Sequence, residues 1–202
     1  PFYIPSFGSS AVCALGYVNA MLELKEQIDD GQAPEPDYIF VTAGTGGTMA
    51  GIELGARIVG LRSKVVGVRI TDWIALNEWL AANLINRATK YLRDRGAPIG
   101  PFKYRSSDVR IVHEYFGGEY ARITPEGIHA KNLCKETDGI VLDTTYTAKT
   151  MAATIDFIKT RAPASANILF WHTYNTRDLA PFLDEGVDRG CLPSAFHCYF
   201  GE

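Results

Sequence analysis

Residues 38–48 constrain the fold more than any other stretch of this chain. A run of apolar and β-branched residues, 38–43, stands directly before Gly44-Thr45-Gly46-Gly47-Thr48. Such a run is typical of a strand that is buried on both faces of a parallel sheet. The apolar spacing after the glycines predicts a helix that ends near Gly60. A buried strand, a tight glycine turn and a helix form the basic unit of an α/β fold.

The same alternation continues along the whole chain. Strands are predicted at residues 2–5, 38–43, 64–70, 109–115, 140–142 and 167–172. Helices are predicted at 11–28, from the glycines to 60, and at 73–93, 125–138 and 147–160. Thr124-Pro125-Glu126 supplies a capping hydroxyl, a proline at the first helical position and an acid in the first turn. The pattern predicts an open, mostly parallel sheet flanked by helices, with ligands at the carboxyl ends of the strands.

Composition excludes several functional classes. The formal net charge of -3 and the scattered 20 Lys and Arg residues give no basic surface for nucleic acid. No apolar run approaches the ~20 residues that cross a bilayer, and the first residues do not resemble a signal peptide. The cysteines form no CxxC pair, so a reducing, cytoplasmic location is expected. The four histidines lack metal-ligand spacing, and no metal site is predicted.

The glycine loop predicts a phosphate site. Glycines let the backbone turn sharply and direct several N–H groups into one concavity, and the positive end of the following helix favours a dianion. Thr45 and Thr48 add hydroxyl donors. The alternative is a tight turn between strand and helix that binds no ligand.

The spacing of the loop narrows the kind of phosphate. A P-loop ends in Gly-Lys-Ser/Thr, whereas this loop continues as Gly47-Thr48-Met49. The dinucleotide pattern GxGxxG fits Gly44 and Gly46 but has Met49 at its third glycine. Asp72 follows the next strand, where a ribose-binding acid stands in such folds, so a nicotinamide-binding oxidoreductase remains an alternative.

Five separate stretches resemble the fold-type II pyridoxal-phosphate enzymes, in particular the D-cysteine desulfhydrase and aminocyclopropane-carboxylate deaminase family. They occur in the family's order at residues 3–19, 39–51, 114–120, 139–149 and 168–173. The resemblance implies a tryptophan synthase β-like sheet and pyridoxal 5'-phosphate as the cofactor, held by Gly44, Thr45, Gly46, Gly47 and Thr48. It also implies a small amino acid as substrate. A homodimer is expected because family members are commonly dimers.

The resemblance assigns further roles to single residues. Tyr120 and Tyr146 match the tyrosines that line the substrate side and serve proton transfer or substrate positioning. The alternative for each is an aromatic side chain packed at a strand end. Ser9 has two interpretations, a contact with the substrate carboxylate and a cap of the first helix, of which the cap is favoured. Lys149 is expected in the first turn of its helix, facing solvent.

Thr147 and Thr173 match positions near the pyridine nitrogen of the cofactor. The residue at Thr147 is a glutamate in aminocyclopropane-carboxylate deaminases and a threonine in desulfhydrase-like members. A neutral hydroxyl leaves that nitrogen largely unprotonated, which suits β-elimination better than ring opening. Thr147 therefore favours a substrate such as D-cysteine, with pyruvate, ammonia and sulfide as products. Its other interpretation is a helix cap.

The sequence also departs from the family. The family's Gly-Tyr-Gly is Glu119-Tyr120-Ala121 here, and its HTGG is His172-Thr173-Tyr174-Asn175. The lysine that forms the Schiff base, together with the small domain, precedes the matched region in the family, and no lysine here matches it. Residues 1–202 are thus expected to be the C-terminal part of the large cofactor-binding domain, inactive without an N-terminal segment or companion chain.

Three functions follow from these patterns. The first is a pyridoxal-phosphate-dependent lyase or deaminase, with β-elimination favoured and aminocyclopropane-carboxylate deamination as its alternative. The second is a binding module that holds a phosphorylated ligand without catalysis. The third is the nicotinamide-binding oxidoreductase that rests on Gly44, Gly46 and Asp72.

Overall fold

The computed structural model describes residues 8–174, 180–182 and 189–195. Four parallel strands form one sheet in the order β3-β2-β1-β4: β1 (Tyr38–Ala43), β2 (Lys64–Arg69), β3 (Arg110–Val112) and β4 (Ile168–Trp171). The predicted parallel α/β sheet is therefore confirmed. The predicted strand at residues 2–5 lies outside the described residues.

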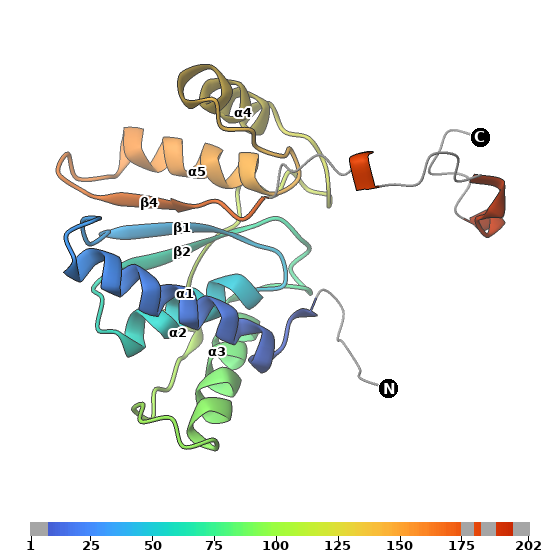
Figure 1. Cartoon of the computed structure of the whole chain (residues 1–202). Coiled ribbons are helices and arrows are strands. Elements are labelled where there is room, and N and C mark those ends of the chain that lie inside the picture. Colours follow the sequence, from blue (N-terminus) through green and yellow to red (C-terminus); the bar gives the residue numbers. More distant parts are fainter. Residues whose placement is uncertain (1–7, 175–179, 183–188, 196–202) are drawn as a thin grey trace.

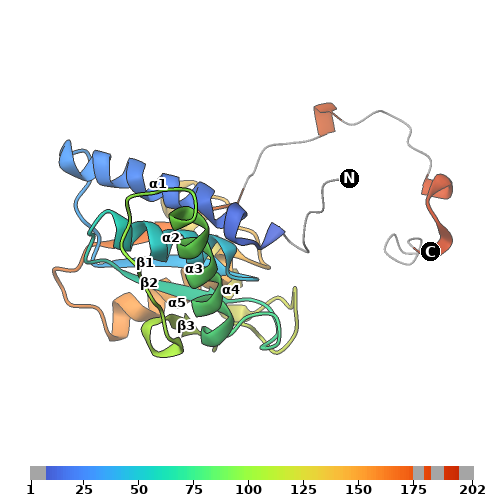
Figure 2. The same ribbon diagram turned by 90° about the horizontal axis from the view of Figure 1, so that it is seen from below.

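Helices cover both faces of the sheet (Figure 1). On one side lie α1 (Ala11–Asp29), α2 (Gly47–Ile58) and α3 (Glu78–Arg93), and on the other lie α4 (Pro125–Asp138) and α5 (Thr147–Thr160). The view from below shows α1, α2 and α3 lying across the near face of the strands (Figure 2). Each layer packs its apolar side against the sheet between them, as expected for a doubly covered parallel sheet.

The apolar run in strand β1 is continuous rather than alternating because both faces of the strand are covered. Ile39, Val41 and Ala43 pack in the cluster beneath α1, α2 and α3, while Phe40 packs on the opposite face with Ala153 of α5. Both faces are out of water, so neither tolerates a charged side chain. The prediction that this strand is buried on both faces is confirmed.

Helix capping agrees with the sequence at α4 and differs at α1 and α3. Thr124 Oγ1 accepts from the N–H of Gly127, as predicted. At α1 the cap is Ser10, whose Oγ accepts from Cys13 N, so the cap prediction for Ser9 is wrong. Helix α3 begins at Glu78 rather than Trp73, because the Asn77 side chain accepts from Leu80 N and ends the preceding turn.

Of two further predicted strands, one is shorter than expected and the other does not form. The strand at 109–115 is limited to Arg110–Val112, and the chain then turns, with Phe116 N–H donating to His113 O. Residues 140–142 form no strand. Leu142 instead packs with Cys134 and Ala148 in the cluster between α4 and α5, so this apolar run contributes to a side-chain core rather than to the sheet.

One acid in the α2 layer is expected to make stability depend on pH. Burial, the largest effect, raises the pKa of Glu53 to about 7. The folded state therefore holds a proton that the unfolded chain releases above its ordinary pKa of 4.5, so stability falls as pH rises from about 4.5 to 7. Glu53→Gln should raise the free energy of unfolding by about 1–2 kcal/mol at pH 8 and flatten this dependence. Urea unfolding at pH 5 and pH 8 measures it; an unchanged pH profile would contradict it.

Candidate functional site

A cavity of about 390 Å³ opens at the carboxyl ends of the strands. Its walls come from the loop after β1, the loop after β2, the start of α1 and the turns that carry two tyrosines. The lining residues are Gly8, Ser9, Cys13, Tyr17, Thr42, Gly44, Thr45, Gly46, Gly47, Thr48, Ile70, Thr71, Tyr120, Tyr146 and Thr173. This set is rich in hydroxyl groups and includes no charged side chain among the described residues.

The glycine loop forms the floor of this cavity. Gly46 lies in the left-handed region at φ 85°, a conformation that favours glycine, and a Cβ there would also crowd the Leu76 side chain at 3.0 Å. Helix α2 starts at Gly47 without a side-chain cap. Its first N–H groups and its positive end are thereby available to an anion in the cavity, with the hydroxyls of Thr45 and Thr48 beside them.

The side chain of Ser9 is hydrogen-bonded to the glycine loop. Its Oγ is hydrogen-bonded to Thr45 Oγ1, and the Cβ position of Gly47 lies 3.3 Å from the same Ser9 Oγ. A larger residue at position 47 would therefore push against Ser9. The structure places Ser9 in the cavity and not at the helix cap, which is the arrangement needed for its predicted substrate contact.

Tyr120 and Tyr146 meet across the cavity, although they are 26 residues apart. Their phenol oxygens are hydrogen-bonded, and their rings stand edge to face with centroids 6.3 Å apart. The hydrogen bond to Tyr120 is the largest effect on Tyr146 and, with burial, raises its pKa to about 12. Tyr146 therefore keeps its proton near pH 7, as an ordinary tyrosine does, and it is a weaker acid than an ordinary tyrosine.

Asp143 organises the turn that presents Tyr146. Its carboxylate accepts hydrogen bonds from the backbone N–H groups of Thr145 (2.9 Å), Tyr146 (2.6 Å) and Thr147 (2.9 Å). It thus satisfies the N–H groups of the two residues before α5 and of Thr147, the first residue of the helix. Asp143 was not identified from the sequence, although an aspartate shortly before a helix is a capping signal.

Thr147 is fully buried at the first position of α5, next to the Tyr146 cap position. Its hydroxyl donates to Asp143 Oδ2 (2.6 Å) and accepts from Asp143 N–H (3.1 Å). Thr147 does not line the cavity, whereas Thr173 does. The proposed cofactor contact of Thr147 remains a prediction, and in this structure its hydroxyl supports the tyrosine turn.

Lys149 does not face solvent, so that prediction is wrong. Its side chain is fully buried, and its ammonium donates to the carbonyl oxygen of Phe116 at 2.7 Å. The helix places Lys149 on the side that packs against α4, where its Cγ lies 3.8 Å from the Cβ position of Gly127. Helical periodicity could not reveal this, because the neighbouring layer comes from a distant part of the chain.

Six lining residues were not identified as site residues from the sequence: Gly8, Cys13, Tyr17, Thr42, Ile70 and Thr71. Thr42 belongs to the carboxyl end of β1, and Thr71 follows β2. The rule that ligands bind at the ends of parallel strands was the signal for these two residues. Asp72, on which the dinucleotide alternative rests, is not among the lining residues.

Comparisons with known proteins agree with this geometry. A model of the family described as "pyridoxal-phosphate dependent enzyme" matches residues 1–173. The chain belongs to this family of pyridoxal-phosphate dependent enzymes. The family assignment favours pyridoxal phosphate over a dinucleotide as the phosphate-bearing group in the glycine loop.

Individual members of the family show which proteins this chain resembles. The chain is 31% identical over 175 residues to D-cysteine desulfhydrase of Klebsiella pneumoniae (strain 342), covering 86% of this chain and 50% of that protein. A crystal structure of an ACC deaminase homologue matches with a TM-score of 0.66 and 30% identity over 82% of this chain and 46% of the other. A threonine deaminase from T.th., at 19% identity and a TM-score of 0.50 over 82% of this chain and 59% of the other, shares the fold. The chain spans about half the length of the curated relative.

The described helices include none long and apolar enough to span a membrane. Within the same described residues, no group of three or more His, Cys, Asp or Glu side chains is arranged to hold a metal ion.

Ala121, beside Tyr120, lies in the left-handed region at φ 62°, where a Cβ clashes with its own backbone. The family has glycine at this position. Ala121→Gly should raise the free energy of unfolding by about 1 kcal/mol, because it relieves this clash. Gly118→Ala, at φ 86° with open space around its Cβ, is the matched reverse change and should lower it. Urea unfolding measures both, and equal effects of the same sign would contradict the interpretation.

Proposed function

We propose that this chain forms the cofactor-binding part of a pyridoxal-phosphate-dependent lyase or deaminase that acts on a small amino acid. β-Elimination from D-cysteine, giving pyruvate, ammonia and sulfide, is the favoured reaction. The observation that carries the proposal is the uncapped start of α2 at Gly47, which shares one cavity with the paired phenols of Tyr120 and Tyr146. Deamination of aminocyclopropane carboxylate is the alternative within the same family.

The phosphate fits the loop by charge and by shape. Backbone N–H groups at Gly46 and Gly47, the positive end of α2 and two threonine hydroxyls form a concave donor set. Thr71 holds the loop from the other side, since its Oγ1 donates to Gly44 O at 2.7 Å. When bound, pyridoxal phosphate supplies an electron sink for carbanion chemistry, while the protein supplies binding and orientation.

The paired tyrosines support a role in proton transfer. A leaving thiolate takes up a proton, and a neutral phenol positioned in the cavity beside the substrate can donate it. In this proposal Tyr146 Oη holds the proton, and Tyr120 Oη orients it through their shared hydrogen bond. Ser9, at the mouth of the phosphate loop, orients the carboxylate of the substrate.

The reactive lysine is proposed to come from elsewhere in the protein. None of the lysines of this chain lines the cavity, and Lys149, which follows the tyrosine turn, is bound to Phe116 O. On this proposal, residues 1–202 alone bind pyridoxal phosphate weakly and are inactive. The lysine then lies in an additional N-terminal segment or in a companion chain.

The proposed substrate class rests on the Thr147 position and on the relatives. The Klebsiella relative carries the name D-cysteine desulfhydrase. A threonine at position 147 cannot supply the carboxylate that would favour protonation of the pyridine nitrogen, so elimination is favoured over ring opening. Thr173 is proposed as the hydroxyl near that nitrogen, because it lines the cavity, whereas the Thr147 hydroxyl is bonded to Asp143.

The experiment uses the product of the complete gene. We expect a pyridoxal-type absorption band and, after borohydride reduction and peptide mass analysis, a phosphopyridoxyl group on a lysine outside residues 1–202. Addition of D-cysteine should then release sulfide and pyruvate in equal amounts. Absence of the chromophore and of the adduct would reject the proposal, and ammonia release from aminocyclopropane carboxylate without sulfide release from D-cysteine would select the alternative.

A further inference from the structure

Phe116 is the fixed point of the segment that leads to Tyr120. Its side chain is only 7% exposed, and its N–H donates to His113 O at 3.4 Å. Gly117 and Gly118 follow with φ of 82° and 86°, so the chain reverses sharply between Phe116 and the tyrosine. A turn of two glycines is intrinsically mobile, and the placement of Tyr120 therefore depends on what holds Phe116.

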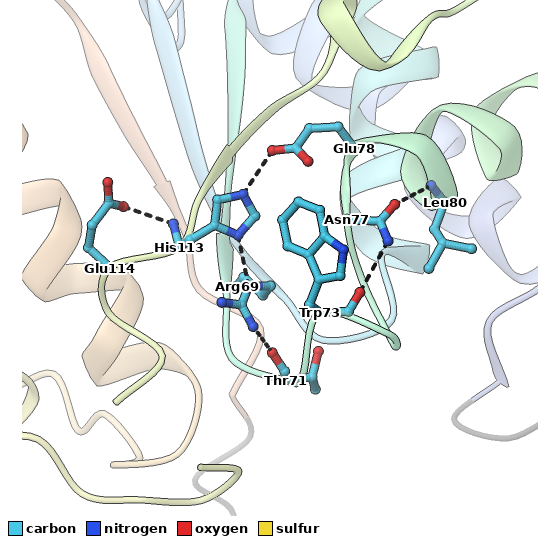
Figure 3. A network of polar contacts seen from close by, with 8 residues as sticks. All are labelled: Arg69, Thr71, Trp73, Asn77, Glu78, Leu80, His113 and Glu114. Carbon is cyan, nitrogen blue, oxygen red and sulfur yellow. Dashed lines mark hydrogen bonds and ion pairs between the residues drawn. The ribbon is translucent and has the colours of Figure 1, made fainter. Parts of the chain in front are cut away.

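Arg69 holds the ring of Phe116 from the sheet side. Its guanidinium carbon lies 4.8 Å from the ring centroid, a cation–π contact. The same guanidinium donates through Nε to His113 Nδ1 (2.8 Å) and through Nη1 to the carbonyl oxygen of Thr71 (Figure 3). Thr71 lines the cavity and donates to Gly44 O, so one arginine connects the phosphate loop with the tyrosine segment.

The His113 ring is fixed in turn by Glu78. Because His113 Nδ1 accepts from Arg69, the ring proton lies on Nε2, which donates to Glu78 Oε1 at 2.8 Å. Burial acts to raise the pKa of Glu78, but hydrogen bonds from His113 and from its own backbone outweigh it and hold the pKa below its usual range. Trp73 packs on the same ring, with centroids 5.2 Å apart (Figure 3).

Lys149 holds the backbone of Phe116 from the opposite side. Its ammonium donates to Phe116 O and lies 5.8 Å from the centroid of the same ring. The side chain is fully buried, and among the described residues no carboxylate forms an ion pair with it. Burial lowers the pKa of Lys149. A buried ammonium without a counter-ion is costly, so the hydrogen bond to Phe116 O is the contact that compensates for the burial of Lys149.

We infer that Arg69 and Lys149 are positioning residues that clamp Phe116 between β2 and α5 and thereby hold Tyr120 against Tyr146. The inference rests on the proposed function for its catalytic consequence, and it adds two residues that do not themselves line the cavity. Lys149 stands three residues after Tyr146 on α5, so the clamp fixes Tyr120 relative to the same helix that presents its hydrogen-bond partner.

The test replaces Lys149 by methionine in the complete gene product loaded with pyridoxal phosphate. Methionine fills a similar space without a charge or a donor. Amide hydrogen exchange of residues 116–122 should become about tenfold faster, because the turn is no longer tied to α5. For D-cysteine, kcat should fall by about 10- to 100-fold, since small displacements of Tyr120, which orients the proton donor Tyr146, have effects of that size, while KM and cofactor affinity stay within about threefold.

Arg69→Lys provides a second variant should Lys149→Met not fold. A lysine keeps a cation near Phe116 but cannot donate to His113 and Thr71 together. Exchange at 116–122 and kcat should therefore change in the same directions as in Lys149→Met, with about a third of the change in their logarithms. The matched controls are Lys64→Met and Arg57→Lys, whose cations lie over Tyr38 (5.1 Å) and Phe102 (5.6 Å) outside the cavity. Both controls should leave exchange at 116–122 and kcat unchanged.

The readouts separate this inference from the proposed function. If the wild-type protein shows no pyridoxal chromophore and no lyase activity, the proposed function fails, and exchange at 116–122 still decides whether the two cations clamp the turn. Exchange equal to wild type in both Lys149→Met and Arg69→Lys overturns the clamp. So does faster exchange with undiminished kcat in an active enzyme, because Tyr120 would then not depend on the clamp for its function.

Discussion

Tyr146→Phe is expected to lower kcat for D-cysteine by about 10²- to 10⁴-fold, the range for loss of a positioned proton donor. KM should change little, because the ring still fills its place and only the phenol oxygen is removed. The structural reason is that Tyr146 Oη lies in the cavity, bonded to Tyr120 Oη. Steady-state assays of sulfide release by the complete gene product measure the effect.

The pH dependence of kcat in Tyr120→Phe should distinguish the roles of the two phenols. The hydrogen bond to Tyr120 is the main cause that raises the pKa of Tyr146 to about 12, so its removal should lower that pKa toward the ordinary value of 10. The alkaline fall of kcat, where Tyr146 loses its proton, should move in the same direction. Tyr38→Phe is the matched control, because Tyr38 lies at the amino end of β1 outside the cavity. An equal loss of activity in the control would contradict the assignment.

Gly51→Ala is expected to lower the free energy of unfolding by about 3 kcal/mol, the upper part of the range for overpacking a core. Helices α1 and α2 cross so closely at this glycine that a Cβ would strike the Ala14 carbonyl oxygen and approach Tyr17 Cβ to 2.6 Å. A backbone oxygen cannot move aside as the end of a flexible side chain can. Because Tyr17 lines the cavity, cofactor affinity should weaken as well.

Gly16→Ala is the control for this prediction. Gly16 lies within α1, and nothing stands within 4 Å of its Cβ position. Alanine is the better helix former, so this change should raise stability by up to about 1 kcal/mol. Urea unfolding of both variants, followed by titration with pyridoxal phosphate, distinguishes close helix packing from a general intolerance of alanine. Equal stability of the two variants would contradict the packing argument.

The sequence predicted most of the fold because its signals are local. The buried run of β1, the glycine turn and the proline start of α4 each depend on neighbouring residues, and all three are confirmed. The predicted start of α3 and the predicted strand at 140–142 were wrong because they depend on more than the local apolar pattern. The apolar periodicity before α3 extends to Trp73, but the Asn77 cap sets the start of the helix at Glu78. The run at 140–142 finds no neighbouring strand to pair with among the described residues, and its Leu142 packs between helices instead.

The glycine turn between β1 and α2 could likewise be predicted from the sequence, because a glycine cluster between a buried strand and a helix determines where N–H groups point, and its binding of phosphate stays a prediction. The cavity around it could not. Tyr17, Thr42 and Thr71 join the loop because the starts and ends of separate elements meet at one edge of the sheet. Spacing along the chain carries little of that information.

The sequence alone determined a parallel α/β sheet, a glycine loop suited to phosphate and a resemblance to pyridoxal-phosphate enzymes, since each follows from residue type and short-range order. Only the tertiary structure decided that Lys149 is buried on Phe116 O and that Tyr120 bonds to Tyr146. It also decided that the Thr147 hydroxyl is engaged by Asp143. These outcomes depend on how distant layers pack, because burial and hydrogen-bond partners are properties of the assembled core and not of the local sequence.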